Sequence, residues 1–191
     1  MNIIQIGVNK SLDACHKFIQ SNKDCIENIY LVEPLPSCIP DIESVFKNFN
    51  NVKIFNLAIC DNSSANSLKL YFPTNDPKSG HASFKYDHLL AHGHRQIDSI
   101  NIECMTLDDF FKNNSIINCE RLYIDTEGLD CSILLNFNYA KYNIKYIEFE
   151  KIHSDGAFTQ GLNYKKCIDK FKMNNYKIKP VGKWNCAAIN I

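Results

Sequence analysis

Short runs of β-branched and aromatic residues alternate along the chain with stretches whose apolar residues recur at helical spacing. The first pattern is typical of buried strands and the second of amphipathic helices. Predicted strands cover residues 3–7, 28–33, 52–59, 68–72, 100–104, 121–125, 144–150, 176–180 and 184–189. Predicted helices cover residues 11–21, 41–49, 129–135 and 162–174, and a short one opens at Thr106. Strands that alternate with helices in this way predict crossover connections and a parallel sheet in an α/β fold.

Turn and cap residues mark several of these ends. Ser11 is placed to cap the first helix, and Thr106 with Asp109 forms a capping-box pattern. Pro34 ends the second strand. Only a short turn, residues 181–183, separates the last two strands, so we expect them to be antiparallel.

The middle of the chain has a different character. Residues 73–95 hold glycine, proline, serine and histidine with little steady periodicity. A stretch of this length inside a compact domain usually has a function. We therefore expect a single domain over residues 1–191, in which residues 73–95 form a lid or a substrate loop.

Composition and charge narrow the classes of partner. Lysine plus arginine balance aspartate plus glutamate, with 21 of each, so global charge favours neither nucleic acid nor a membrane surface. Lysines between residues 165 and 183 are a local exception, which we interpret as a solvated helix face. No apolar run is long enough for a membrane span. The nine scattered cysteines lack CxxC spacing and predict reduced thiols, hence a cytoplasmic protein.

The ends of the first three strands carry candidate binding residues. Gly7 follows the first strand and allows close approach of a ligand, although the other glycines of a dinucleotide fingerprint are missing. Glu33 ends the second strand, where an acidic residue can accept hydrogen bonds from the ribose hydroxyls of a nucleoside cofactor. Ala58 and Asp61, at the end of the predicted third strand, could flank an adenine ring, with Asp61 accepting from its amino group. For Gly7 and Asp61, a plain turn is an equally good interpretation.

Two carboxylates leave the strand at residues 121–125. In an extended segment Asp125 and Glu127 point to the same side, so both can face one cleft and bind a cation, a hydroxyl or a sulfonium. The alternative is that Glu127 only caps the next helix. Glu148 and Glu150 leave the following strand in the same manner, with His153 close behind.

Histidines in the middle segment raise a metal hypothesis. His88 and His92 have the spacing that shares one helix face, and His94 follows two residues later. We favour a substrate-facing lid with one histidine as a base, and we expect no metal.

Seven segments together resemble the FkbM methyltransferase family, and they occur in the order of that family: IIQIGVNKS, LVEPLPS, LAICD, SGHASFKYDHLLAHGH, IECMTLDDFF, LYIDTEGLDCSIL and YIEFEKIH. The most specific is IDTEG followed by a helix. The resemblance implies a Rossmann-like class I methyltransferase fold, with a mostly parallel seven-stranded sheet, an antiparallel C-terminal strand and a small β insertion. It also implies S-adenosylmethionine as cofactor and methyl transfer to oxygen. The residues that would line the cofactor are Gln5, Gly7, Asn9, Glu33 and Ala58, with Asp125 and Glu127 beside its methyl group.

The chain departs from the family in its first turn, where Val8 and residues 10–11 replace small residues and glycine. The methionine end of the cofactor is therefore expected to be held differently. The chain also begins directly at the first strand, where many relatives carry a helix over the cofactor site.

These observations lead to three functional hypotheses. The first is an O-methyltransferase for a sugar, glycan or other small molecule, in which His88, His153 or Asp125 acts as base and Glu127 orients the acceptor. The second is methylation of an RNA ribose hydroxyl by a Lys-Asp-Lys-Glu constellation, for which Asp125, Glu150 and either Lys145 or Lys151 are a partial match. The third is a binding module without turnover, motivated by the single glycine of the first turn.

Overall fold

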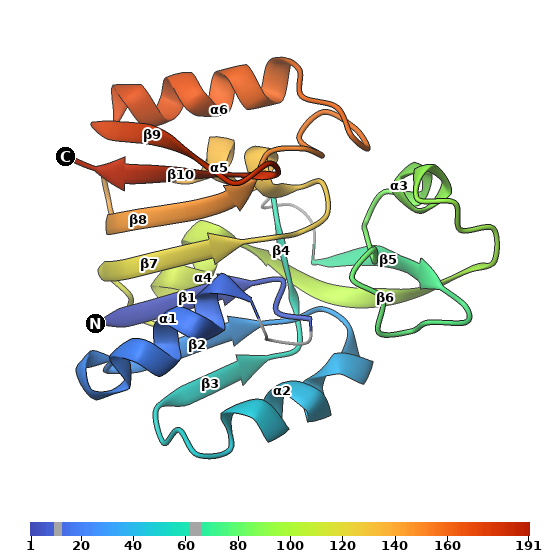
Figure 1. Ribbon diagram of the computed structural model, residues 1–191, viewed down its shortest axis with the longest axis horizontal. Coiled ribbons are helices and arrows are strands. Elements are labelled where there is room, and N and C mark those ends of the chain that lie inside the picture. Colours follow the sequence, from blue (N-terminus) through green and yellow to red (C-terminus); the bar gives the residue numbers. More distant parts are fainter. Residues whose placement is uncertain (10–12, 62–65) are drawn as a thin grey trace.

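A seven-stranded sheet forms the centre of the molecule (Figure 1), seen in a computed structural model that describes residues 1–9, 13–61 and 66–191. Its strand order is β3-β2-β1-β7-β8-β10-β9. The strands are β1 (Asn2–Ile6), β2 (Asn28–Val32), β3 (Val52–Phe55), β7 (Asn118–Ile124), β8 (Asn143–Glu150), β9 (Tyr176–Val181) and β10 (Asn185–Asn190). The order reverses between β1 and β7, and ligands of open α/β sheets bind at such a switch point.

Strand directions confirm the predicted sheet. The pairs β3–β2, β2–β1, β1–β7 and β7–β8 are parallel, and β10 is antiparallel to both of its neighbours. Gly182, with φ +62°, lies in the turn between β9 and β10. The mixed sheet of a Rossmann-like methyltransferase fold is therefore present.

Helices cover both faces of the sheet and enclose two cores. The helices α1 (Ala14–Asn22) and α2 (Ile39–Phe46) bury their apolar residues on one face. On the other lie α4 (Leu107–Asn113), α5 (Asp130–Asn136) and α6 (Leu162–Met173). Along β1, Ile3 joins the first core and Ile4 and Ile6 join the second, as the alternation of strand side chains requires. Two short 3₁₀ helices, Lys23–Cys25 and Pro36–Cys38, precede β2 and α2.

The predicted third strand over residues 52–59 is wrong in its extent. It divides into β3 and β4 (Ala58–Cys60), and β4 leaves the main sheet to pair in parallel with β6 (Ile97–Thr106). The strand β5 (Ser67–Pro73) pairs antiparallel with the other edge of β6, which gives a second sheet of order β4-β6-β5. This is the small β insertion that we expected. In Figure 1, β5 lies on the side toward which the arrowheads of β1, β2, β7 and β8 point.

Residues 73–95 are more ordered than their sequence suggests. They contain a helix, α3 (Tyr86–Ala91), and Ser83 forms an isolated bridge with Tyr71 of β5. The residues between the bridge and α3 run past the loop that follows β7, as described below. Whether this segment acts as a lid or a substrate loop stays a prediction.

Several predicted helix starts are shifted. The helix α1 begins at Ala14, where Asp13 accepts a hydrogen bond from the backbone N–H of His16 at 3.0 Å. The predicted cap Ser11 lies outside the described residues. The helix α2 begins at Ile39 and ends at Phe46, earlier than the predicted 41–49 at both ends. Pro40 favours this start, because a proline in the first helical turn leaves no hydrogen bond unmade. Thr106 caps α4, as predicted.

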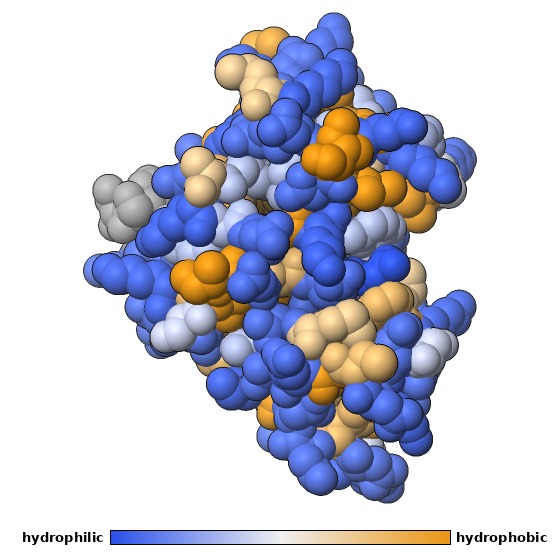
Figure 2. Space-filling model, turned by 90° about the vertical axis from the view of Figure 1, so that its left-hand side faces the viewer, coloured by the Kyte–Doolittle hydropathy of each residue, from blue (hydrophilic) through white to orange (hydrophobic). Residues whose placement is uncertain are grey.

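The face shown in Figure 2 is mostly hydrophilic, with hydrophobic side chains in separate patches. Hydrophobic side chains scattered in this way are normal on protein surfaces. Within the described part of the chain, none of the helices has the length and hydropathy needed to cross a lipid bilayer.

Candidate functional site

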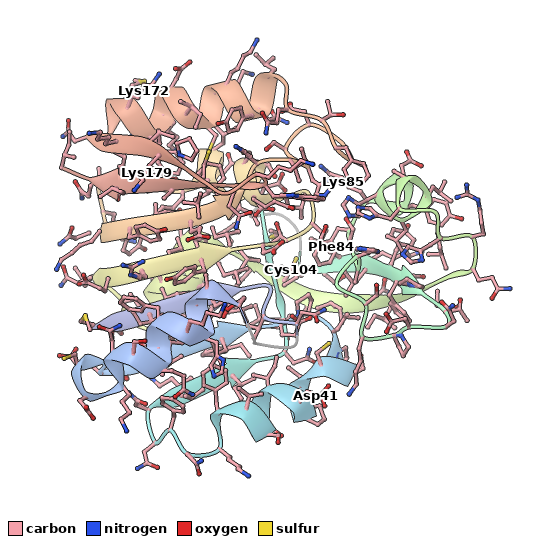
Figure 3. The ribbon with its side chains drawn as sticks, in the orientation of Figure 1. Asp41, Phe84, Lys85, Cys104, Lys172 and Lys179 are labelled. Atoms are coloured by element: carbon pink, nitrogen blue, oxygen red, sulfur yellow. The ribbon has the colours of Figure 1, made fainter. Side chains whose placement is uncertain are left out.

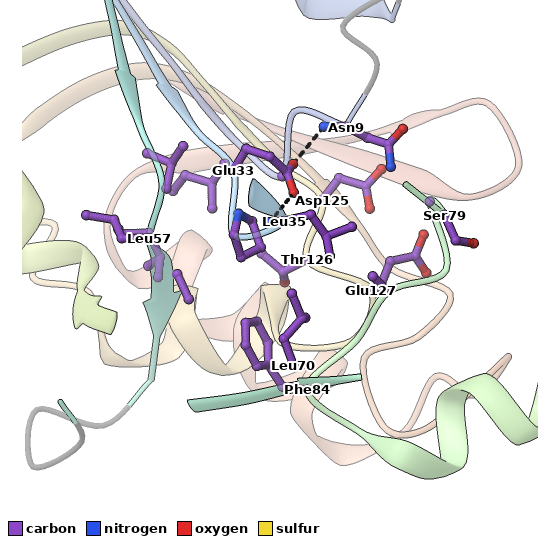
Figure 4. Close-up of a pocket in the computed structure, with 18 residues that line it drawn as sticks. Asn9, Glu33, Leu35, Leu57, Leu70, Ser79, Phe84, Asp125, Thr126 and Glu127 are labelled. Carbon is purple, nitrogen blue, oxygen red and sulfur yellow. Dashed lines mark hydrogen bonds between the residues drawn. The ribbon is translucent and has the colours of Figure 1, made fainter. Parts of the chain in front are cut away.

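A pocket of about 680 Å³ opens at the ends of β1, β2 and β7 (Figure 4). Predicted residues from separate parts of the chain meet here, because parallel strands end at one edge of the sheet. The pocket is lined by Gly7, Asn9, Glu33, Ala58, Asp125 and Glu127, together with residues that the sequence did not single out, among them Leu35, Leu57, Ser79, Gly80, Phe84 and Thr126.

Gly7 connects three strand ends. Its N–H donates to the carbonyl of Val32 at 2.9 Å, and the N–H of Asp125 donates to the carbonyl of Ile6 at 2.9 Å. Gly7 has φ +78°, and a Cβ atom built on it would lie 1.7 Å from the carbonyl oxygen of Asp125. Glycine is therefore required here so that β1 and β7 can approach each other, a reason distinct from room for a ligand.

Glu33 is held as a buried acceptor at the pocket. Its residue is 3% exposed, and its carboxylate accepts hydrogen bonds from the backbone N–H groups of Asn9 and Leu35, each at 2.8 Å. Burial raises the pKa of Glu33, while these backbone donors act in the opposite direction. Two backbone donors leave part of the acceptor capacity of a carboxylate unused. The side chain is thus fixed in place and can still accept from hydroxyl groups of a ligand.

Apolar side chains form the wall beside Glu33. Leu35, Leu57, Ala58 and Phe84 line the pocket, and Leu57 and Phe84 are labelled in Figure 4. Phe84 comes from the segment between β5 and α3, so the insertion completes the pocket. A flat aromatic ligand can pack against such a wall without leaving buried polar groups unpaired.

The loop after β7 is anchored by Asp130, which sequence reasoning missed. Asp130 is 1% exposed, and its carboxylate accepts from the Thr126 hydroxyl at 2.7 Å and from the Thr126 N–H at 3.2 Å. Its other oxygen accepts from the N–H of Glu150 at 3.2 Å. Asp130 therefore ties the ends of β7 and β8 together. The sequence did contain a signal for this contact, because an acidic residue in the first turn of a helix can reach back to a backbone N–H that precedes the helix.

Residues before α3 clamp the same loop from the other side. The Ser83 hydroxyl donates to the carbonyl of Glu127 at 2.8 Å, and Lys85 Nζ donates to the carbonyl of Gly128 at 2.5 Å. Figure 3 shows Phe84 and Lys85 on this segment, beyond the ends of the central strands. Glu127 has φ +52°, which is a strained backbone conformation for a residue with a side chain. The clamp holds the Glu127 backbone in this conformation.

Carboxyl groups crowd this end of the pocket. Burial raises the pKa of Glu127 to about 8, and the nearby Asp130 adds to the rise. Burial likewise raises the pKa of Glu150 to about 10, with further contributions from Asp125 and Glu127. Asp125 is accessible from the pocket. Desolvation by the surrounding protein raises its pKa well above its usual value, and the negative charges of Asp130 and Glu127 add to the rise. A positive charge placed among these groups would favour their ionised forms.

Histidines lie directly behind Glu127. His88 Nε2 is 2.9 Å and His153 Nε2 is 3.9 Å from Glu127 Oε2, and both histidines are 2% exposed. Burial lowers the pKa values of His88, His92 and His153 to about 4. The contact between His88 and Glu127 therefore joins a neutral imidazole and a carboxyl with raised proton affinity. Neither His88 nor His153 lines the pocket itself.

The histidine grouping differs from the one that the sequence suggested. Four residues, His88, His92, Glu127 and His153, each bring one potential metal-ligand atom, and these atoms lie within 4.8 Å of one another. His94 is not among them; its Nε2 lies 2.9 Å from Nδ1 of His81. The sequence analysis assigned His88, His153 and Glu127 to one site but not to one group of potential metal ligands, because they come from three different parts of the chain.

Two predicted cofactor residues lie outside the pocket. The amide of Gln5 donates to Asp13, and Gln5 lines a different recess together with Glu148. Gln5 points there because strand side chains alternate, and Ile6 takes the side that faces the pocket. Asp61 lines a third recess beside Thr106, because β4 has left the main sheet.

Lysine positions bear on the RNA hypothesis. Lys145 lies near the start of β8, where its Nζ is 2.9 Å from Glu120 Oε2, so it is remote from the strand ends that form the pocket. The lysines between 165 and 183 are exposed except for Lys170, whose Nζ donates to the carbonyls of Leu135 and Phe137 at 2.6 and 2.7 Å. Figure 3 places Lys172 on α6 and Lys179 on β9. This agrees with a solvated surface.

Solved structures with the same fold include a methyltransferase and two fibrillarins. A methyltransferase FkbM from Methylobacillus flagellatus KT superimposes with a TM-score of 0.58 at 11% identity, over 98% of this chain and 43% of that one. The fibrillarin of Methanococcus jannaschii, a pre-rRNA processing protein, superimposes with a TM-score of 0.53 at 12% identity, over 98% of this chain and 65% of that one. Aeropyrum pernix fibrillarin, crystallised with natively bound S-adenosyl-L-methionine, superimposes with a TM-score of 0.50 at 13% identity, over 98% of this chain and 66% of that one. The chain thus spans less than two thirds of each of these proteins.

Sequence comparison identifies the family. Curated protein sequences gave no significant match. The family model of the methyltransferase FkbM domain, however, matches residues 5–178, which is most of the chain and contains every strand end that lines the pocket. The resemblance drawn from the sequence motifs is confirmed, and the chain belongs to the FkbM methyltransferase family.

Proposed function

We propose that this chain is an S-adenosylmethionine-dependent methyltransferase that transfers the methyl group to a hydroxyl oxygen of a sugar, glycan or other small molecule. The observation that carries the proposal is the meeting of Glu33, Asp125 and Glu127 in one pocket at the switch point of the sheet. Membership of the FkbM family supports the reaction type.

The residues of the pocket fit this cofactor. The buried Glu33 carboxylate, held by two backbone N–H groups, is suited to accept from the two ribose hydroxyls. The apolar wall at Leu57 and Ala58 suits an adenine ring. The carboxyl groups of Asp125 and Glu127 at the other end suit a sulfonium, because a positive charge favours their ionised forms.

The cofactor supplies an electrophilic methyl group on a sulfonium, and transfer leaves the electron pair of the broken C–S bond on sulfur. The protein has to hold a hydroxyl oxygen in line with that methyl and to accept its proton. Asp125 is the best placed of the three candidate bases, because it lines the pocket and its raised pKa makes it a stronger base. Glu127 orients the acceptor, and His88 and His153 hold Glu127 from behind.

Loss of Glu33 should weaken cofactor binding. Hydrogen bonds to a charged group contribute about 1.5–3 kcal/mol, so Glu33→Ala is expected to raise the Kd of S-adenosylhomocysteine by about 10–100-fold in calorimetry. Glu43, an exposed glutamate on α2, provides the control, and Glu43→Ala is expected to bind like the wild type. Equal affinity of Glu33→Ala and wild type would remove Glu33 from the cofactor site.

The acceptor class is tested by transfer of a radiolabelled methyl group. The purified protein is incubated with methyl-labelled S-adenosylmethionine and with monosaccharides, oligosaccharides, small hydroxylated molecules or RNA. We expect label in a sugar or small hydroxyl compound. Label in RNA with strongly salt-dependent binding would support the ribose hypothesis instead. Binding of cofactor without transfer to any acceptor would support a module without turnover.

A further inference from the structure

We propose that His88, His92, His153 and Glu127 bind a divalent first-row transition-metal ion at the edge of the cofactor pocket. The proposal extends the proposed function, because one of the four ligands, Glu127, also lines the pocket in which the acceptor hydroxyl has to be held. It replaces our expectation from the sequence that the protein binds no metal.

The geometry brings four potential ligands to one point. Their ligand atoms lie within 4.8 Å of one another, whereas the ligands of a tetrahedral ion with bonds of about 2.0–2.2 Å are roughly 3.4 Å apart. Side-chain movements that shorten the longest of these separations by roughly 1.4 Å close that difference. The rings already lie close together: the centroids of His88 and His92, and those of His88 and His153, are each 4.6 Å apart.

Unsatisfied nitrogen atoms point to a missing partner. Nε2 of His88 and Nε2 of His92 are buried and have no hydrogen-bond partner within the described residues. His88 is 2% exposed, and its Nε2 approaches Glu127 Oε2 to 2.9 Å without the angles of a hydrogen bond. Buried polar atoms nearly always have a partner, so two buried nitrogen atoms without one in a single cluster indicate that a ligand binds there. Neutral imidazoles are also the form that binds metal ions.

Backbone hydrogen bonds and packing in the fold hold these ligands in place. His88 and His92 lie one turn apart at the end of α3, where the N–H of His92 donates to the carbonyl of His88 at 3.1 Å. Glu127 is positioned by the Asp130 anchor and the Ser83 clamp described above. Phe158 packs against the rings of His92 and His153, at 4.7 and 4.9 Å, and covers the cluster.

The donor set selects the class of ion. Three imidazoles and one carboxylate suit Zn²⁺, Fe²⁺, Co²⁺ or Ni²⁺, whereas Mg²⁺ and Ca²⁺ prefer all-oxygen sites. Since Glu127 also lines the cofactor pocket, an ion bound to it is within reach of a ligand there. A fifth coordination position could take the acceptor oxygen, and an oxygen bound to such an ion loses its proton more easily.

His153 should be the weakest of the three imidazole ligands. Its Nδ1 accepts from the N–H of Phe158 at 3.0 Å, which places the ring proton on Nε2, the atom that faces Glu127. An ion at Nε2 requires that proton to move to Nδ1, so the hydrogen bond from Phe158 has to break. No such bond opposes metal binding by His88 or His92 in the described structure.

Metal binding is tested on untagged protein, so that no added histidines compete. The protein is stripped with a chelator and titrated with Co²⁺, whose d–d absorption reports imidazole ligands in a low-coordinate site, and with Zn²⁺ in competition. Wild type is expected to bind one ion. His88→Ala and His92→Ala should weaken the affinity by about 100-fold or more, and His153→Ala by less. His16→Ala, on α1, is the matched control and should bind like the wild type.

The outcomes separate this site from the proposed function, because affinity for S-adenosylhomocysteine is measured on the same samples. No Co²⁺ spectrum from folded wild type, or a spectrum that His88→Ala leaves unchanged, would overturn the metal site even if the cofactor binds. Metal binding that depends on His88 and His92, with no cofactor binding, would confirm the metal site and reject the proposed function.

Discussion

Asp125→Asn and Glu127→Gln are each expected to lower kcat by about 10²–10⁴-fold, the range that general-base catalysis contributes. Both substitutions keep the size of the side chain and remove its ability to become an anion. In Asp125→Asn the side chain no longer accepts the proton of the acceptor hydroxyl. In Glu127→Gln the acceptor is no longer held by a carboxylate. The measurement is methyl transfer to the acceptor identified by the labelling experiment.

Affinity for S-adenosylhomocysteine is the control for these two variants. Since Glu33 and the apolar wall stay intact, we expect the Kd to change only a few-fold, so that the loss falls on turnover. Asp87→Asn, in the first turn of α3, is a matched substitution outside the pocket and should retain activity. Normal turnover by both carboxylate variants would refute the assignment of the reacting end of the pocket.

Gly7→Ala is expected to lower the free energy of unfolding by about 2–5 kcal/mol. A side chain at φ +78° costs about 1–2 kcal/mol, and the overlap of the new Cβ with the Asp125 carbonyl, at 1.7 Å, adds the cost of an overpacked core, about 1–3 kcal/mol. The ends of β1 and β7 would have to separate. Urea denaturation followed by circular dichroism measures the change.

Gly182→Ala separates the two contributions. Gly182 also has a positive φ, +62°, but a Cβ there meets no atom within 4 Å, so only the backbone cost of about 1–2 kcal/mol applies. We expect Gly7→Ala to be clearly the more destabilising of the two. Equal effects would mean that contact between the two strand ends does not require glycine at position 7.

The sequence predicted the elements well because their periodicity is local. The apolar run of β1 and the helical spacing in α6 are set by neighbours in the chain, and a parallel sheet follows from the order of the elements. The division of residues 52–59 into β3 and β4 was missed, because apolar residues predominate throughout this stretch and only pairing with β6, distant in sequence, draws β4 away. The helix α3 was missed because its six residues are too few to show a helical period.

The site was predictable where it depends on strand ends and unpredictable where it depends on loops. Gly7, Glu33 and Asp125 meet because parallel strands end at one edge. Asp61 was placed in the pocket only because β4 was taken as part of the main sheet. The contacts of Ser83 and Lys85 with the loop after β7 join residues more than forty positions apart, at separations of 44 and 43. No spacing rule reveals such contacts.

A crystal structure of the protein with S-adenosylhomocysteine tests the central claim most directly. We predict that both ribose hydroxyls lie within hydrogen-bond distance of the Glu33 carboxylate and that the sulfur lies beside Asp125 and Glu127. Binding of S-adenosylhomocysteine at another place, without contact to the Glu33 carboxylate, would contradict the claim that these strand ends form one methyl-transfer pocket.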